Sequence, residues 1–142
     1  MPLRLQSTPR VGGGSAFVVR PPMDATRTFK FEIRSQQERV AAGSFPVQRQ
    51  RGASCFGSHQ SVGGFSIFAG VIIEHSLADD GSASLSLGLY EIEQAPDSPF
   101  GIRQRQVLKS GIAVGAESGE QEAESVMLGD KHEFVFTSAA VA

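Results

Sequence analysis

The sequence has little of several features that would narrow its function. Its 142 residues include a single cysteine and neither tryptophan nor asparagine, and lysine is scarce beside arginine. One cysteine excludes an internal disulfide framework of the kind that stabilises small secreted domains. This usage of lysine, arginine and asparagine is typical of a GC-rich coding genome, so the composition favours a bacterial or phage origin.

Long apolar runs are also missing. No stretch approaches the roughly 18 apolar residues that a transmembrane helix needs, and residues 1–22 lack the hydrophobic region of a signal peptide. We therefore expect no membrane insertion, and a location in the cytoplasm or in a virus particle. An export signal that had been removed would leave the same sequence.

The charge balance is close to neutral. A formal net charge of -2 gives no overall field that would attract nucleic acid, so we expect no nucleic-acid partner. The sequence is 40% hydrophobic and 20% charged, which is ordinary for a globular protein. A chain of this length can bury about 70% of its unfolded surface without a metal or disulfide. We expect a folded chain that needs no cofactor.

Short alternating strands and turns are what the sequence does contain. Two apolar runs, residues 64–74 and 84–93, flank Asp79-Asp80-Gly81 and predict a β-hairpin. Residues 26–34 alternate strictly and predict a half-buried strand. Residues 36–42 suit either a helical turn or a strand, and Gly43 is expected to end that element. Further strands are predicted at residues 45–50, 100–108, 112–116, 126–128 and 133–137.

This pattern predicts an all-β fold, an antiparallel β-sandwich or jelly-roll-like domain of roughly eight to ten short strands. In the second strand of the hairpin the apolar phase changes after Leu89, which predicts a bulge or bend near Gly88. The predicted core consists of the in-phase residues of the clearest strands: Phe29, Phe31, Ile33, Phe65, Ile67, Val71, Leu85, Leu87, Phe134 and Phe136.

The first 22 residues differ from the rest of the chain. Prolines and a run of three glycines separate two short apolar segments, residues 3–6 and 16–20. We expect residues 1–22 to form a flexible arm or edge strands, and residues 23–142 to form one β-sandwich domain.

The strand predicted at residues 65–73 is apolar on both faces. A sandwich strand needs only one apolar face for its own core, so the other face is left for a partner. The predicted interface contains Phe65, Phe68 and Ile72, together with Val18 of the arm, which could add to a neighbouring sheet. The leading hypothesis is a non-catalytic structural or assembly protein of a phage particle or bacterial surface complex, acting by self-association or with a protein partner.

A second hypothesis is a β-sandwich that binds a small ligand or carbohydrate. Residues 51–64 and 95–101 are predicted loops that could build a shallow site at one end of the sandwich. The candidate ligand residues are Arg51, Ser54, Cys55 and His59.

An enzyme that uses Cys55 and His59 is the third hypothesis, because a thiol becomes a nucleophile when a nearby base lowers its pKa. The four-residue spacing matches no local cysteine-protease motif, so we expect no catalytic site. Zinc could recruit Cys55, His59, His75 and His132, but only the first two are near neighbours in the sequence, and we expect no metal site.

Overall fold

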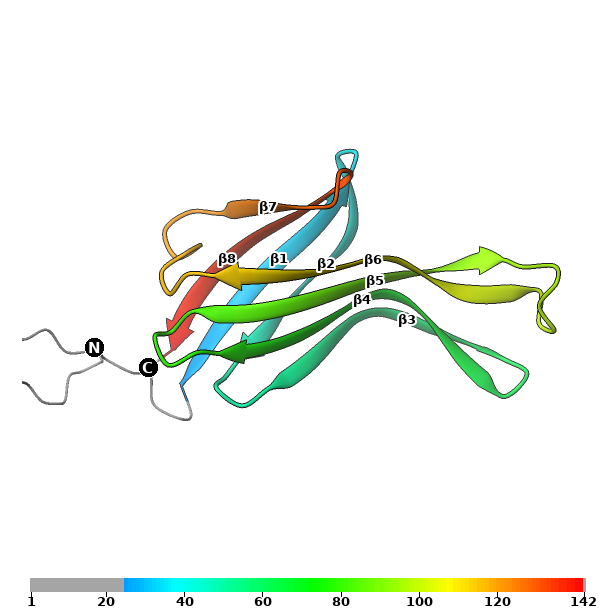
Figure 1. Cartoon of the computed structure of the whole chain (residues 1–142), viewed down its shortest axis with the longest axis horizontal. Helices are drawn as coiled ribbons and strands as arrows, with labels where there is room; N and C mark the ends of the chain where they lie inside the picture. The colour runs from blue at the N-terminus through cyan, green and yellow to red at the C-terminus, as the bar shows by residue number, and fades with distance from the viewer. Residues whose placement is uncertain (1–24, 142) are drawn as a thin grey trace, which may run out of the picture.

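The computed structural model describes residues 25–141, which form two four-stranded antiparallel sheets packed face to face (Figure 1). The predicted arm, residues 1–22 with Val18, lies outside the described residues. The described residues contain eight strands and no helix, so the predicted all-β sandwich is confirmed. In spatial order the first sheet contains β2 (Glu38–Val47), β1 (Thr26–Ser35), β8 (His132–Val141) and β7 (Glu124–Leu128), and the second contains β3 (Gly52–Val62), β4 (Phe65–Leu77), β5 (Ala83–Gln94) and β6 (Ile102–Val114).

A two-residue turn joins β1 to β2. Gln36 and Gln37 have φ angles of 52° and 71°, the left-handed conformations that match the twist of a tight hairpin. Residues 36–42 are therefore a turn followed by a strand, and β2 continues through Gly43 to Val47. The expectation that Gly43 ends this element is wrong, because Gly43 pairs with Phe31 within the β1–β2 ladder.

The hairpin predicted around Asp79-Asp80-Gly81 is confirmed as β4 and β5. Asp80 stabilises the turn by accepting hydrogen bonds from the backbone N–H and the hydroxyl of Ser82, at 3.0 and 2.7 Å. The predicted irregularity near Gly88 is also present, as a register shift between β5 and β6 at Leu89 and Tyr90.

Two predicted elements are corrected by the structure. Residues 51–64 are not a loop: residues 52–62 form β3, which pairs with β4 along its whole length. Residues 100–108 and 112–116 are not separate strands, since β6 runs without a break and places Ser110 and Gly111 opposite Leu87 and Ser86. In both cases the hydrogen bonds of a neighbouring strand outweigh the turn preference of glycine and serine.

The core is built around phenylalanine rings. Phe31 of the first sheet contacts Phe45 and Phe134 of the same sheet, and its ring lies 5.0 Å from that of Phe56 of the second sheet. Eight of the predicted core residues are buried, while Phe65 is exposed and Ile67 is half-buried. The core therefore stops short of the first residues of β4.

A buried arginine closes one end of the sandwich. Arg27 donates hydrogen bonds to the carbonyl oxygens of Gly81 and Ser118 at 3.2 and 2.8 Å, and its guanidinium lies within 3.3 Å of the Ser138 hydroxyl. Burial lowers the pKa of Arg27, and the charges of Glu120 and Glu124 oppose this shift. The side chain remains charged and ties the β4–β5 turn and the β6–β7 loop to the first sheet.

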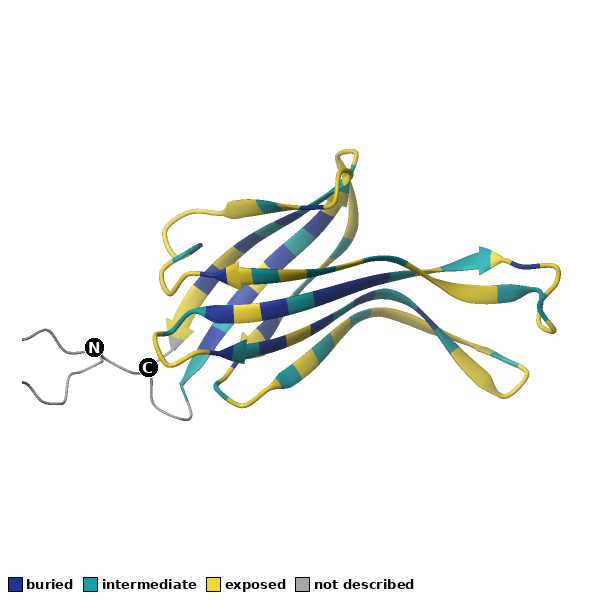
Figure 2. Ribbon diagram, in the orientation of Figure 1, coloured by how far each residue is buried: buried dark blue, intermediate teal, exposed yellow. Residues whose placement is uncertain are grey.

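The second sheet is longer than the first. In Figure 1 the strands β3 to β6 run on past β2, the last strand of the first sheet on that side. Figure 2 shows that buried residues are concentrated where the two sheets overlap, and that the projecting part is mostly exposed or half-buried. Phe65 and Ile67 lie in this projecting part, which explains why they miss the core.

Candidate functional site

We call the projecting part of the second sheet, residues 58–69 and 91–105, the overhang. It consists of two hairpins, the tip of β3–β4 and the tip of β5–β6. The ladder between β4 and β5 ends at the pair Gly70 and Tyr90, so beyond this point the two hairpins are no longer paired with each other as strands. Each hairpin remains paired within itself.

Facing glycines allow the bend from which the overhang starts. Gly57 and Gly70 are opposite each other in β3 and β4. A Cβ on Gly70 would lie 2.2 Å from the carbonyl oxygen of Phe56, and one on Gly57 would lie 2.1 Å from that of Ala69. The two backbones approach so closely here that only glycine fits.

Side chains fill the gap between the two hairpins. Phe68 projects into it, with its ring 5.1 Å from that of His59 and 6.3 Å from that of Tyr90. The backbone N–H of Phe68 donates to the side-chain oxygen of Gln104 at 2.9 Å, which replaces a missing strand partner. Phe68 is only 6% exposed, so its prediction as an uncovered interface residue is wrong. Ile72 is half-buried on the same face.

The outer end of the overhang carries an exposed aromatic pair. Phe65 and Phe100, one from each hairpin, are 64% and 39% exposed, and their ring centroids are 5.4 Å apart. Gly63 has a φ of 57° and leaves room for Phe100, whose ring lies 2.3 Å from where a Cβ would be. Phe100 had no part in the predicted interface, because its contact with the β3–β4 turn is set by tertiary structure. The turns near residues 64 and 100 lie together at the tip of the overhang, where Phe100 contacts Phe65 and lies against Gly63.

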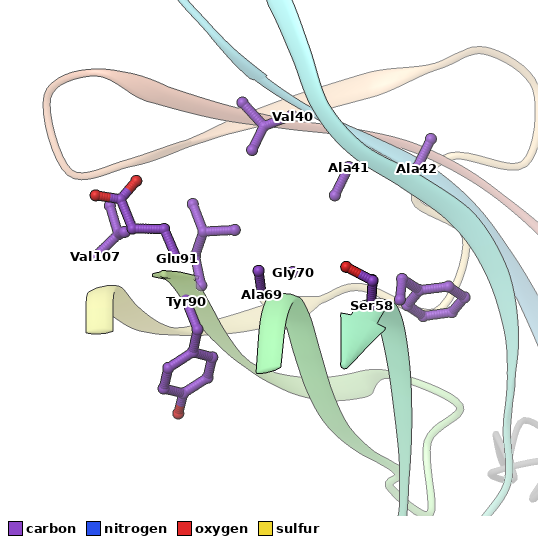
Figure 3. A pocket seen from close by; sticks show the side chains of 12 residues that line it. Val40, Ala41, Ala42, Ser58, Ala69, Gly70, Tyr90, Glu91 and Val107 are labelled. Carbon is purple, nitrogen blue, oxygen red and sulfur yellow. The ribbon is translucent and has the colours of Figure 1, made fainter. Parts of the chain in front are cut away.

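A cavity of about 590 Å³ lies where the overhang leaves the sandwich. Figure 3 shows Val40 and Ala41 of β2 on one side and Ala69 and Gly70 of β4 on the other. Leu89, Val107 and Phe56 add to an apolar lining, and the polar groups are those of Ser58, Tyr90 and Glu91. The Tyr90 ring points away from β2 in this view, while Glu91 lies at the end of the cavity near Val40 (Figure 3).

Beyond the cavity, the β5–β6 hairpin carries an ion-pair network. Arg105 pairs with Glu91 and, at 3.1 Å, with Glu93, which also accepts a 2.6 Å hydrogen bond from Arg103. The hydrogen bonds from Arg105 to Glu91 and from Arg103 to Glu93 raise the pKa of each arginine. Exposed pairs of this kind contribute little to stability, but they give the overhang a defined pattern of charge.

The four candidate ligand residues do not converge. Cys55 and His59 lie in β3 rather than in a loop, and both are exposed. Four residues along a strand separate them by about 13 Å, so they cannot form a thiol–imidazole pair. His59 instead lies 3.2 Å from the Ser66 hydroxyl. Arg51 lines a separate 250 Å³ depression with Glu74, Ser84 and Ser86.

Ser54, the remaining candidate, contacts His75, and the sequence did not predict this pair. The Ser54 hydroxyl lies 3.0 Å from Nε2 of His75, which is 7% exposed and stacks on Phe45. Burial lowers the pKa of His75. Among the described residues nothing bonds to its Nδ1, so the third group that orients the base in a catalytic triad is missing from this pair. Only the pairing of β3 with β4 brings the two residues together.

The described part of the chain contains no group of three or more His, Cys, Asp or Glu side chains arranged to hold a metal ion. Nor does any helix among residues 25–141 have the length and apolar character needed to cross a membrane.

Comparisons with known proteins add no identification. No protein-family model matches the sequence, and no match is found among curated proteins or solved structures. The class that the fold itself defines is an antiparallel β-sandwich whose second sheet projects as two hairpins.

Proposed function

We propose that the protein is a non-catalytic assembly module that self-associates through its overhang, as a structural subunit of a phage particle or bacterial surface complex would. The observation that carries this proposal is the exposed pair Phe65 and Phe100 at the overhang tip. Exposed apolar patches mark interaction sites, and aromatic residues, phenylalanine among them, are enriched in the cores of protein interfaces.

The shape of the overhang supports the same function. Its hairpins project away from the core, so a partner can contact both of them without disturbing the packing of the two sheets (Figure 2). The close approach of Gly57 and Gly70, together with the Phe68–Gln104 contact, holds the hairpins in one arrangement. A preorganised projection loses less conformational entropy on binding than a flexible loop does.

Sedimentation velocity tests this proposal with two serine variants. The wild type should sediment as more than a monomer at tens of micromolar, and the double variant Phe65→Ser, Phe100→Ser should weaken association about tenfold or more. Met127→Ser is the matched control, because Met127 is 56% exposed but lies on β7, away from the overhang. A wild type that stays monomeric, or an equal effect of the control, would contradict the proposal. Phe68 is unsuitable as a probe because it is buried.

The cavity favours one alternative, a small apolar ligand. Its volume of about 590 Å³ and its largely apolar lining are those of a small-molecule site. Ala69→Phe would fill the space from the β4 side. If the protein binds a fluorescent apolar probe with one-to-one stoichiometry, and this variant abolishes the binding without lowering the melting temperature, the alternative gains support.

A further inference from the structure

The first sheet ends at β2, directly beside the cavity, and the second sheet continues past it (Figure 1). The overhang therefore has a face on the cavity side that no strand of the first sheet covers. Ala69 of the overhang and Val107 next to it are half-buried residues that line the cavity on this face, and Val40 at the start of β2 is exposed. One more strand alongside β2 would cover these groups and extend the first sheet.

The exposed edge of β2 has a short unprotected stretch. At one end Val40 is the extra residue of the register shift between β1 and β2, and at the other end Pro46 lacks an N–H donor. Bulges and prolines are the devices that keep edge strands from pairing. Residues 41–45 between them have neither, and Ala42, Gly43 and Ser44 are small enough to admit larger side chains on an added strand.

We infer that residues 16–20 of a second copy of this chain add to β2 as an antiparallel strand over the cavity. The inference rests on the proposed self-association and names a second contact within it. The donor sequence, Ala16-Phe17-Val18-Val19-Arg20, is apolar and β-branched and matches the five-residue length of the open stretch. With Phe17 and Val19 directed into the cavity, Val18 lies opposite Ala42 on the outer face.

Charge favours the antiparallel direction. An antiparallel donor places Arg20 near the start of β2, at the end of the cavity where Glu91 lies (Figure 3), and Arg20 would there share the Glu91 carboxylate with Arg105. A parallel donor would place Arg20 near Ser58 at the other end, where no acidic residue lines the cavity. Backbone pairing supplies affinity in this mode of recognition, while the pocket selects the side chains.

The length of the connecting segment assigns the donor to a second copy. Arg39 pairs with Arg34, so the start of β2 lies eight residues along β1 from Thr26, about 26 Å. Only five residues lie between Arg20 and Thr26, and the six Cα–Cα steps from one to the other span at most about 22 Å. A chain cannot place its own residues 16–20 antiparallel on its own β2, whereas a neighbouring chain meets no such limit.

Crosslinking between separately purified full-length chains tests this inference. Both carry Cys55→Ala to remove the exposed native thiol; one carries Val18→Cys and the other Ala42→Cys. After mixing and mild oxidation, the disulfide dimer that links position 18 of one chain to position 42 of the other should form. In the control mixture Ser125→Cys replaces Ala42→Cys, and the yield of disulfide dimer should be at least ten times lower. Ser125 is the matched control, since it is exposed on β7, the opposite edge strand of the first sheet.

The outcomes separate this inference from the proposed function. If Phe65 and Phe100 drive association in sedimentation but no 18–42 disulfide exceeds the control, the donor-strand inference is overturned and the proposed function stands. If Val18→Cys and Ala42→Cys in one dilute chain bridge within the monomer, the second-copy assignment is overturned. Phe17→Asp should reduce the 18–42 product about tenfold.

Discussion

At the scale of single residues, burial decides what His75 does. The imidazole stacks on Phe45 at a centroid distance of 5.2 Å and contacts Ser54, and Nδ1 has no hydrogen-bond partner among the described residues. Protonation would place a charge in the core, so burial lowers the pKa of His75. His75, considered from the sequence only as a conceivable zinc ligand, is thus a neutral residue of the core.

This burial predicts acid sensitivity. The unfolded chain binds the His75 proton more readily than the folded chain does, so the stability linked to His75 is complete above about pH 6.5 and is lost as the pH falls below that value. Urea unfolding measures the free energy of unfolding at pH 7.5 and at pH 5.5. The decrease between the two pH values should be smaller for His75→Leu than for the wild type. His59→Gln, on the exposed His59, should behave like the wild type; an unchanged acid dependence in His75→Leu would remove His75 as the cause.

At the scale of elements, the pair Gly57 and Gly70 determines how β3 and β4 continue into the overhang. The strands pair throughout, but they bend where neither residue carries a Cβ. Gly70 has a φ of 142°, a backbone conformation that other residues rarely adopt. The glycines are therefore part of the strand structure, and they do not act as turns.

Replacing Gly70 tests this role. Gly70→Ala should lower the free energy of unfolding by about 1–3 kcal/mol, because the new methyl group meets the Phe56 carbonyl and the backbone is strained. Gly111→Ala is the control, because a Cβ at this position would have no neighbour closer than 3.9 Å. The free energy of unfolding of this variant should differ from that of the wild type by less than about 0.5 kcal/mol. Equal effects in chemical denaturation would show that the bend tolerates a side chain.

At the scale of the whole molecule, contacts between phenylalanine rings hold the two sheets together. Phe31 contacts Phe56 across the sandwich and Phe45 and Phe134 within its own sheet. The overhang has no such layer above it, so the molecule combines a packed body with a projecting surface. The part of the second sheet that packs on the first sheet therefore contributes to stability, whereas the overhang provides the proposed assembly surface.

Truncating Phe31 should lower the stability of the packed sandwich far more than truncating Phe65 at the overhang tip. Phe31→Ala should lower the free energy of unfolding by about 3–5 kcal/mol, because it removes a buried ring at the junction of the two sheets. Phe65→Ala at the exposed tip should cost less than about 1 kcal/mol. Urea denaturation followed by circular dichroism measures both values, and a midpoint for Phe31→Ala close to that of the wild type would show that β1 is peripheral.

The sequence by itself determined the class of fold, most strands and most of the core. Period-two alternation at Phe29, Phe31 and Ile33 and the turn at Asp80 are local patterns, and local sequence is sufficient to specify them. Only the tertiary structure decided where β3 pairs, how far the first sheet reaches, and which apolar residues remain uncovered. Phe68 and Phe65, three residues apart in one strand, show the reason: Phe68 is buried and contacts Tyr90, whereas Phe65 contacts the exposed Phe100 and stays 64% exposed. Alternation specifies the face of a strand, whereas burial depends on what the rest of the chain places against that face.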